Sequence, residues 1–341
     1  MKQHDTQSAI SLAKVALLLR YVGPLETAGA PVDRFLTQTK IPANLLQHPG
    51  AVIPLEHGFR FVELACRTLG TEHLGLYVGQ ASLLEGLGPF GDILRRALTL
   101  HEYFDKAIRL YNTLMTNQRI WLSQGADEVR FNITTMGDVG IAAYQSHLEN
   151  FVVTIDTIRN VAGPDWFPRE VSIAYRPRET FPDTDLFAGS RVTTGTGESW
   201  LTIPRALLQQ PLRRRHGTGS PSRTGAGVAP PLPGDLYGLV QLQVGELLTN
   251  RAVGIDVVAE SLIMSRRSLQ RRLADEGLTF SQILAETRLR LAADWLQNTD
   301  KPVGEIAFDL GYRDASNFTR AFRRQTGVSP QRFRDNADWI D

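Results

Sequence analysis

Two arginine-rich stretches near the C-terminus carry side chains that can read DNA bases. The first contains Arg267, Gln270 and Arg271, and the second contains Asn317 and Arg320. Arginine can make two hydrogen bonds to the edge of guanine, and asparagine or glutamine can make two to adenine. When such residues share one face of a helix, they predict base recognition in a DNA major groove.

The elements that must position these residues form a pattern that occurs twice between Val257 and Arg334. Ala259 corresponds to Ala307 and Leu269 corresponds to Phe318, which leaves one extra residue in the second copy. Each copy predicts a helix, a tight turn and a second helix. A repeat that occurs only twice indicates a duplicated module and not a solenoid, which needs about three or more units.

The second helix of each copy has one apolar face, made by residues four positions apart. The opposite faces are therefore free to contact DNA. In the first copy this free face contains Ser265, Arg266, Arg267, Gln270 and Arg271. In the second copy it contains Ser316, Asn317, Thr319, Arg320, Arg323 and Arg324. We expect base contacts from most of these residues, and phosphate contacts from Thr319, Arg323 and Arg324.

Residues 236–335 resemble the DNA-binding domain of the AraC/XylS family of bacterial transcription regulators. The resemblance is carried by Ile306-Ala307, Leu310-Gly311-Tyr312, Ser316-Asn317-Phe318, Arg320, Phe322-Arg323-Arg324, Gly327, Ser329-Pro330 and Phe333-Arg334. An ordinary amphipathic helical bundle would explain neither the duplication nor the Gly–Tyr turn.

This resemblance implies two helix-turn-helix units joined by one long helix. The family's contact positions fall on the residues named above and also on Ala315, which could touch only a thymine methyl group. The second copy is therefore expected to be the weaker reader. The resemblance also implies activation of transcription by contact with RNA polymerase.

The long helix is expected over Thr279–Asn298. At 1.5 Å per residue it would be about 30 Å long, close to the distance of about 34 Å between successive major grooves. One chain could then read two grooves of double-stranded DNA. Arg288, on this helix, is expected to form a structural ion pair and not a DNA contact.

Composition restricts the class of protein. The 341 residues are 42% apolar and have a formal net charge of +1, so the argument for DNA depends on where the arginines lie. Cys66 is the only cysteine, which excludes a disulfide framework and a cysteine-based metal site within one chain. The polar start and the absence of a long apolar run predict a cytoplasmic protein without membrane contact.

No catalytic pattern is found in the sequence. The seven histidines are scattered, and neither an H-E-x-x-H nor a G-x-S-x-G motif occurs. Glu149 and Asp156 share a helix face, but a surface face gives the same spacing. Gly86–Gly91 matches G-x-G-x-x-G without a preceding strand, so we interpret it as a turn before a helix. We therefore expect no enzyme activity, no cofactor and no metal.

The sequence predicts three regions: residues 8–210 form an α+β domain, residues 211–234 a flexible linker, and residues 235–335 an all-α domain. In the first domain, helices should come first, the earliest over Ser8–Val22 and ended by Pro24. A small mixed or antiparallel sheet should follow, with one long helix packed on it. The linker contains Arg213–His216, which either contacts phosphates or is simply solvated.

Parts of the first domain resemble the ligand-sensing domain of one subgroup of AraC-type regulators, which differs from the short cupin-like sensor of the arabinose regulators. The matching residues are Leu87-Gly88-Pro89-Phe90-Gly91, Leu94, Thr99-Leu100, Glu102, Trp200–Pro204 and Ala206-Leu207-Leu208. The resemblance implies a small-molecule effector and a homodimer contact. A domain that only dimerises remains the alternative.

Overall fold

The computed structural model describes residues 10–81, 84, 87–125, 127–137, 140–212, 231–248 and 253–335. These residues form two compact units. Of the described residues, those within 11–49 and 53–232 belong to the N-terminal unit, and residues 10, 50–52 and those within 233–335 belong to the C-terminal unit. Most of the predicted linker, including Arg213–His216, and Gly86 of the glycine motif lie outside the described residues.

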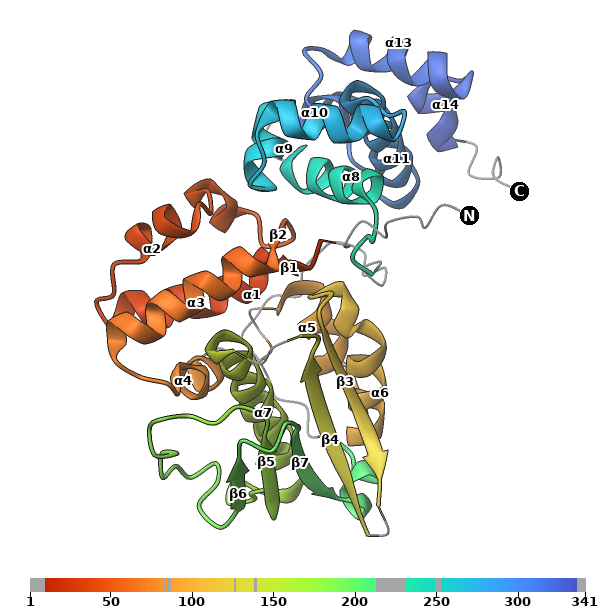
Figure 1. Cartoon of the computed structure of the whole chain (residues 1–341). Coiled ribbons are helices and arrows are strands. Elements are labelled where there is room, and N and C mark those ends of the chain that lie inside the picture. Colours follow the sequence, from red (N-terminus) through yellow and green to blue (C-terminus); the bar gives the residue numbers. More distant parts are fainter. Residues whose placement is uncertain are drawn as a thin grey trace, which may run out of the picture. The chain divides into compact units, whose positions relative to one another are not determined.

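Helices dominate the first half of the N-terminal unit (Figure 1). They are α1 (Val15–Thr27), α2 (Val32–Thr39), α3 (Leu55–Leu69), α4 (Leu74–Ala81), α5 (Gly88–Arg95) and α6 (Leu100–Leu110), with the short 3-10 helices η1 (Ala43–Gln47) and η3 (Tyr111–Thr113). Residue types set several ends. Gly70 ends α3 in the left-handed conformation at φ 65°. The Thr99 hydroxyl accepts the backbone N–H of Glu102 and so caps α6.

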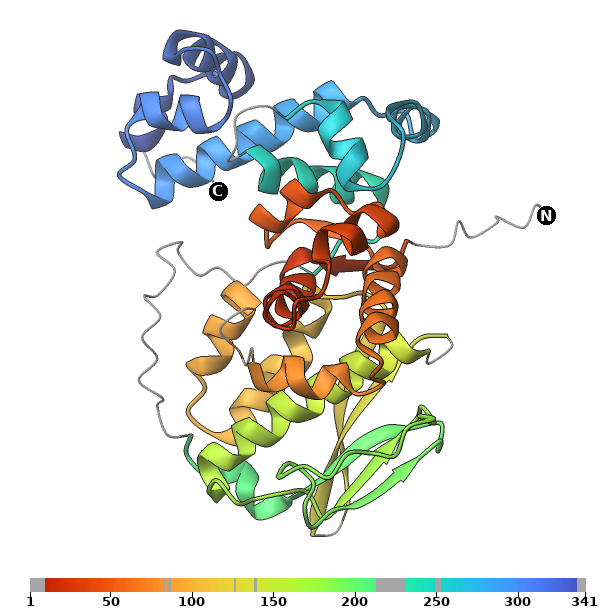
Figure 2. The same cartoon turned by 90° about the vertical axis from the view of Figure 1, so that its left-hand side faces the viewer.

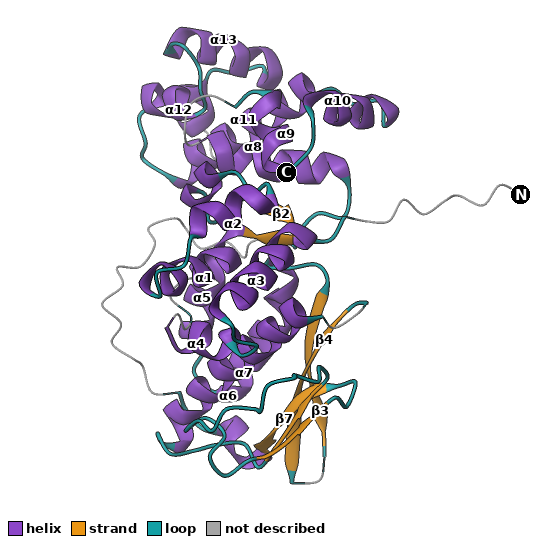
Figure 3. Ribbon diagram, turned by 60° about the vertical axis from the view of Figure 1, so that its left-hand side comes forward, coloured by secondary structure: helices purple, strands orange, loops and turns teal. Residues whose placement is uncertain are grey.

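A five-stranded sheet forms the second half of the N-terminal unit. Its strands are β3 (Gln118–Gln124), β4 (Glu128–Thr135), β5 (Glu170–Ile173), β6 (Arg191–Thr194) and β7 (Ser199–Pro204), in the order β3-β4-β7-β5-β6. The β5–β6 pair is parallel and the others are antiparallel, so the sheet is mixed. The 3-10 helix η4 (Arg205–Gln209) follows β7. Figure 3 shows helices on one side of the sheet.

The long helix α7 (Ile141–Ala162) is the centre of the apolar core, where Phe151, Ile155 and Ile158 are fully buried. Helix α4 packs against it at very short range because two glycines face α7. A Cβ on Gly75 would lie 2.2 Å from the Gln145 carbonyl oxygen, and one on Gly79 would lie 2.6 Å from the Val152 Cβ. Only glycine allows this approach.

The prediction for the first helix was wrong at both ends. Residues Leu12–Lys14 form β1, which forms a two-stranded sheet with β2 (Val52–Pro54), and the helix begins only at Val15. The cause is distant in sequence, because Lys14 N donates to the Leu114 carbonyl at 2.8 Å. Pro24 lies inside α1 instead of ending it. Because Pro24 lies close to the C-terminal end of α1, the helix continues past it for one more turn, and Ala28 N donates to the Pro24 carbonyl at 3.0 Å.

The C-terminal unit consists of helices within the described residues. They are α8 (Leu236–Leu247), α9 (Ile255–Ser261), α10 (Arg266–Asp275), α11 (Phe280–Asn298), α12 (Val303–Asp309), α13 (Ala315–Thr326) and α14 (Pro330–Asp335). Figure 2 shows α11 as a continuous blue helix with one helix pair at each of its ends. The fold class predicted from the sequence is confirmed.

Candidate nucleic-acid interface

Helix α9, a four-residue turn and α10 form the first helix-turn-helix unit. Ala259, Leu262, Leu269 and Leu273 are buried and hold the two helices together. Ser265 begins α10, because its hydroxyl accepts the backbone N–H of Ser268 at 3.1 Å. The sequence predicted a base contact for Ser265, and the structure shows this additional role as a helix cap.

Helix α12, a five-residue turn and α13 repeat this arrangement. Ala307, Leu310, Phe318 and Phe322 are buried at the corresponding positions. Asp314 caps α13 by accepting the backbone N–H of Asn317 at 2.7 Å. The extra residue predicted for the second turn is therefore present.

The two turns share one backbone conformation but not one residue type. In the second turn Gly311 has φ 72° and Tyr312 N donates to the Ala307 carbonyl at 3.0 Å. In the first turn Ile263 has φ 55° and Met264 N donates to the Ala259 carbonyl at 2.8 Å. A β-branched residue in the left-handed region is strained, whereas glycine is not.

Helix α10 exposes Arg267, Gln270 and Arg271 on the face opposite its buried leucines. Within the described residues, none of these three side chains has a hydrogen bond or an ion pair to another side chain. Arg266 is also exposed, but its Nη1 lies 3.1 Å from Asp256 Oδ2. An ion pair between exposed groups contributes little stability. The four side chains are thus available to a ligand.

Helix α13 presents its predicted contacts differently. Ala315, Ser316, Arg320, Arg323 and Arg324 are exposed, whereas Asn317 and Thr319 are half-buried. The Asn317 amide donates to Asp314 Oδ2 at 2.7 Å and accepts from Arg320 Nη2 at 2.6 Å. Two of the predicted base-reading side chains are therefore engaged with each other.

Helix α11 holds the two units at its two ends. A capping box between Thr279 and Gln282 fixes its start. Its 19 residues span about 28 Å.

Arg288, on α11, contacts the second turn. Its guanidinium lies 5.0 Å from the centre of the Tyr312 ring, and its Nη2 donates to the Gly311 carbonyl at 3.4 Å. Burial lowers the pKa of this guanidinium. Arg288 therefore has the expected structural role, but through an aromatic ring and a carbonyl group. The expected ion pair of Arg288 is not found among the described residues.

A structural role that sequence reasoning missed belongs to Arg334. From α14 its Nε donates to the Leu296 carbonyl at 3.3 Å, and its Nη2 donates to the Lys301 carbonyl. Phe333 packs edge-on against Phe322, with ring centres 5.3 Å apart. Arg334 therefore attaches α14 to the end of α11 and to the segment before α12, and Phe333 attaches it to α13.

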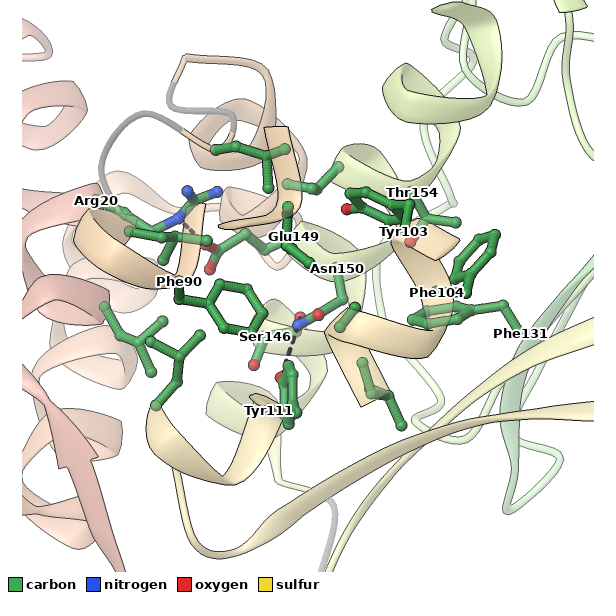
Figure 4. A pocket seen from close by; sticks show the side chains of 18 residues that line it. Arg20, Phe90, Tyr103, Phe104, Tyr111, Phe131, Ser146, Glu149, Asn150 and Thr154 are labelled. Atoms are coloured by element: carbon green, nitrogen blue, oxygen red, sulfur yellow. Dashed lines mark hydrogen bonds and ion pairs between the residues drawn. The ribbon is translucent and has the colours of Figure 1, made fainter. Parts of the chain in front are cut away.

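The N-terminal unit contains an apolar cavity between α1, α5, α6 and α7 (Figure 4). Arg20 and Glu149 meet at its wall and form an ion pair through Nε and Oε1. Arg20 is 2% exposed and Glu149 is 7% exposed. The sequence pattern does not predict this pair, since the spacing of Glu149 and Asp156 suits a surface face equally well. The available signal was a lone arginine inside the apolar run of α1.

These features define a DNA-binding regulator with two helix-turn-helix units and a separate α+β unit. A family model for the arabinose-binding domain of AraC transcription regulator, N-terminal, matches residues 29–212, and one for a helix-turn-helix domain matches residues 258–336. The first match covers more than half of the chain, so the protein belongs to the AraC family of transcription regulators.

Known proteins of this kind match over most of the chain or over a part of it. The regulator VirS of Mycobacterium tuberculosis is 25% identical over 336 residues, which cover 95% of this chain and 96% of VirS. The transcriptional activator RhaS of Escherichia fergusonii is 36% identical over 88 residues, 26% of this chain and 32% of RhaS. The crystal structure of the regulator CdpR from Pseudomonas aeruginosa is similar with a TM-score of 0.37 and 22% identity, over 89% of this chain and 96% of CdpR.

The known proteins named above are transcription regulators. Within the described residues, no helix is both long and apolar enough to cross a membrane.

Proposed function

We propose that this protein is an effector-responsive transcription activator whose α10 and α13 enter two successive major grooves of double-stranded DNA. The observation that carries the proposal is the exposed, unengaged set Arg267, Gln270 and Arg271 on a helix whose other face is buried. A helix of this kind fits a major groove with its polar side chains toward the base edges. The length of α11 suits a second contact about one helical turn of DNA away.

Base reading and phosphate binding are assigned to different residues. Arg267, Gln270 and Arg271 read bases in one groove, and Ser316, Asn317 and Arg320 read the next. Ser265, Arg266 and Ala315 lie at the edges of these two sets. Thr319, Arg323 and Arg324 bind phosphate groups.

The proposal is tested with Arg271→Ala and Arg323→Ala on operator variants obtained by selection from a random DNA library. Arg271→Ala should lose about 1–3 kcal/mol of discrimination at one base position, because a bidentate contact to one base is removed. Arg323→Ala should weaken binding to all sequences alike and reduce the slope of log K against log salt by about 0.9. Arg272→Ala, on the flank of α10, is the matched control and should keep the base preference. Uniform loss of affinity in both test variants would refute the division into reading and phosphate-binding residues.

Activation is proposed because RhaS, which matches 26% of this chain, carries the name of a transcriptional activator. An activator of this family would act through RNA polymerase and would bind its operator as a homodimer. Transcription in vitro with purified polymerase tests the first point, and analytical ultracentrifugation of the full chain tests the second. Lower transcript yield on adding the protein would show repression instead.

Effector response is proposed because the N-terminal unit matches a family model for a ligand-binding domain and encloses a cavity with a few polar groups. Operator affinity measured across a metabolite library tests it. A response to one compound class supports sensing. A well-folded protein whose operator affinity responds to no compound would favour the alternative, an N-terminal unit that only dimerises.

A further inference from the structure

The cavity of the N-terminal unit has a wall that restricts the chemistry of its ligand. Most of its lining is apolar and includes Leu17, Phe90, Leu94, Phe104 and Phe131. Figure 4 shows Arg20 and Glu149 pointing toward each other on one side, and Phe104 and Phe131 on the opposite side. The water-accessible space is about 50 Å³. A second cavity of about 50 Å³ adjoins it and shares Leu17, Ser146 and Glu149.

The charged groups of the wall cancel. Arg20 and Glu149 form a buried ion pair, and no other lysine, arginine, aspartate or glutamate lines this first cavity among the described residues. Lys14 lines only the second cavity and has an interaction of its own. Tyr21 reinforces the pair, because its hydroxyl hydrogen-bonds Glu149. Burial and then the Glu149 carboxylate raise the pKa of Tyr21, so it stays a neutral donor. A charged ligand would add a net charge to a mostly apolar space, which is costly without a partner of opposite charge.

Two polar groups on α7 are placed to hold a neutral ligand. Asn150 and Thr154 lie four residues apart and therefore on the same helix face. The Asn150 amide hydrogens are used by the Tyr111 hydroxyl at 3.1 Å and the Ser146 carbonyl at 2.8 Å, which leaves its Oδ1 as an acceptor. Thr154 is 3% exposed and lines the cavity, and its hydroxyl has no hydrogen-bond partner among the described residues.

The Thr154 hydroxyl lies at the cavity surface and is free to hydrogen-bond a ligand, whereas the hydroxyl of another buried threonine is already used inside the protein. The Thr39 hydroxyl, for example, donates to the Phe35 carbonyl at 2.8 Å. A ligand group that both donates and accepts would satisfy Thr154 and Asn150 together. Hydroxyl and primary amide groups have this property.

We propose that this cavity is the effector site and takes a small uncharged molecule with an apolar body and one hydroxyl or amide group. The inference rests on the proposed effector response and adds its chemistry. At about 10–15 Å³ for one water, the two adjoining spaces together have room for about seven to ten water-sized atoms, so a ligand of about six non-hydrogen atoms fits.

Three probes that share a cyclopentyl ring test the charge rule on the full chain: cyclopentanol, cyclopentylamine and cyclopentanecarboxylate. Thermal unfolding and isothermal titration at pH 7 measure stabilisation and affinity. Cyclopentanol should stabilise the protein, whereas the ammonium and the carboxylate should bind at least about tenfold more weakly because each brings an uncompensated charge. Equal binding of all three would overturn the proposal.

Two variants test the residues. Thr154→Val keeps the shape and should weaken cyclopentanol binding about fivefold, the value of one hydrogen bond. Thr39→Val, also buried but away from the cavity, should leave it unchanged. Glu149→Gln removes one negative charge from the cavity wall, so cyclopentanecarboxylate should bind the variant more tightly than it binds wild type. Unchanged cyclopentanol binding by Thr154→Val, or no gain in carboxylate affinity in Glu149→Gln, would overturn the assignment.

The test separates this inference from the proposed function. If a metabolite changes operator affinity in wild type and Thr154→Val alike, the protein senses an effector but this cavity does not bind it. If no compound changes operator affinity while cyclopentanol binds through Thr154, the site exists and the effector response is wrong.

Discussion

The buried His147 predicts how the stability of the N-terminal unit depends on pH. It is 1% exposed, and its ring nitrogens contact two hydroxyls, with Nδ1 2.8 Å from Ser199 Oγ and Nε2 3.0 Å from Thr135 Oγ1. Burial lowers the pKa of His147 from 6.5 to about 4. The folded protein therefore keeps His147 neutral at a pH where the unfolded chain binds a proton.

The direction in which stability changes with pH follows from this difference in bound protons between the folded and the unfolded chain. Above about pH 7 neither state is protonated at His147, so the residue adds no pH dependence. As the pH falls through 6.5, only the unfolded chain gains a proton, and the free energy of unfolding decreases until the pH reaches about 4. At about 1.4 kcal/mol for each pH unit, the complete loss is about 3 kcal/mol. Between pH 7.5 and pH 5 it is about 2 kcal/mol.

Urea unfolding of wild type and His147→Gln at pH 7.5 and pH 5 measures this effect. The variant should be less stable at pH 7.5, because the ring contacts are lost. Its further loss at pH 5 should be smaller than that of wild type by about 2 kcal/mol. His101→Gln is the control, since His101 is exposed. The lowered pKa of His73 contributes equally to all three proteins. An equal pH dependence in wild type and His147→Gln would refute the reasoning.

The two turns and α14 give further predictions for the C-terminal unit. Gly311→Ala should lower the free energy of unfolding by about 1 kcal/mol, because alanine is strained at φ 72°. Ile263→Gly should change the free energy of unfolding by less, since relief of backbone strain offsets the loss of the side chain. Urea unfolding of both variants measures this contrast. Arg334→Ala should cost about 1.5–3 kcal/mol by removing hydrogen bonds of a charged group to two carbonyls. Hydrogen exchange in α14 should rise in this variant, whereas Arg332→Ala, which is exposed, should leave exchange unchanged.

Local signals in the sequence predicted most elements. Thr99 at the start of α6 and Gly70 at the end of α3 mark helix ends through interactions within a few residues. The buried faces of α10 and α13 followed from apolar residues four positions apart. Such features depend on near neighbours in the chain, so sequence pattern alone is sufficient to find them.

Features that depend on distant residues were not predictable in this way. Strand β1 depends on the Leu114 carbonyl, and the cavity wall depends on the pairing of Arg20 with Glu149. Neither partner can be identified from a local pattern. The roles of the DNA-contact residues remain predictions, since they depend on bound DNA, which the proposed binding experiments supply.

The two helix-turn-helix units differ in how ready their side chains are to bind DNA. On α13, Arg320 donates to Asn317, which in turn donates to Asp314. These hydrogen bonds must be exchanged before Arg320 and Asn317 can each make two bonds to a base, and the exchange reduces the net gain. On α10, Arg267, Gln270 and Arg271 have no such bonds to give up within the described part of the chain. We therefore expect α10 to supply the larger share of sequence discrimination, and α13 to contribute mainly affinity through Arg323 and Arg324.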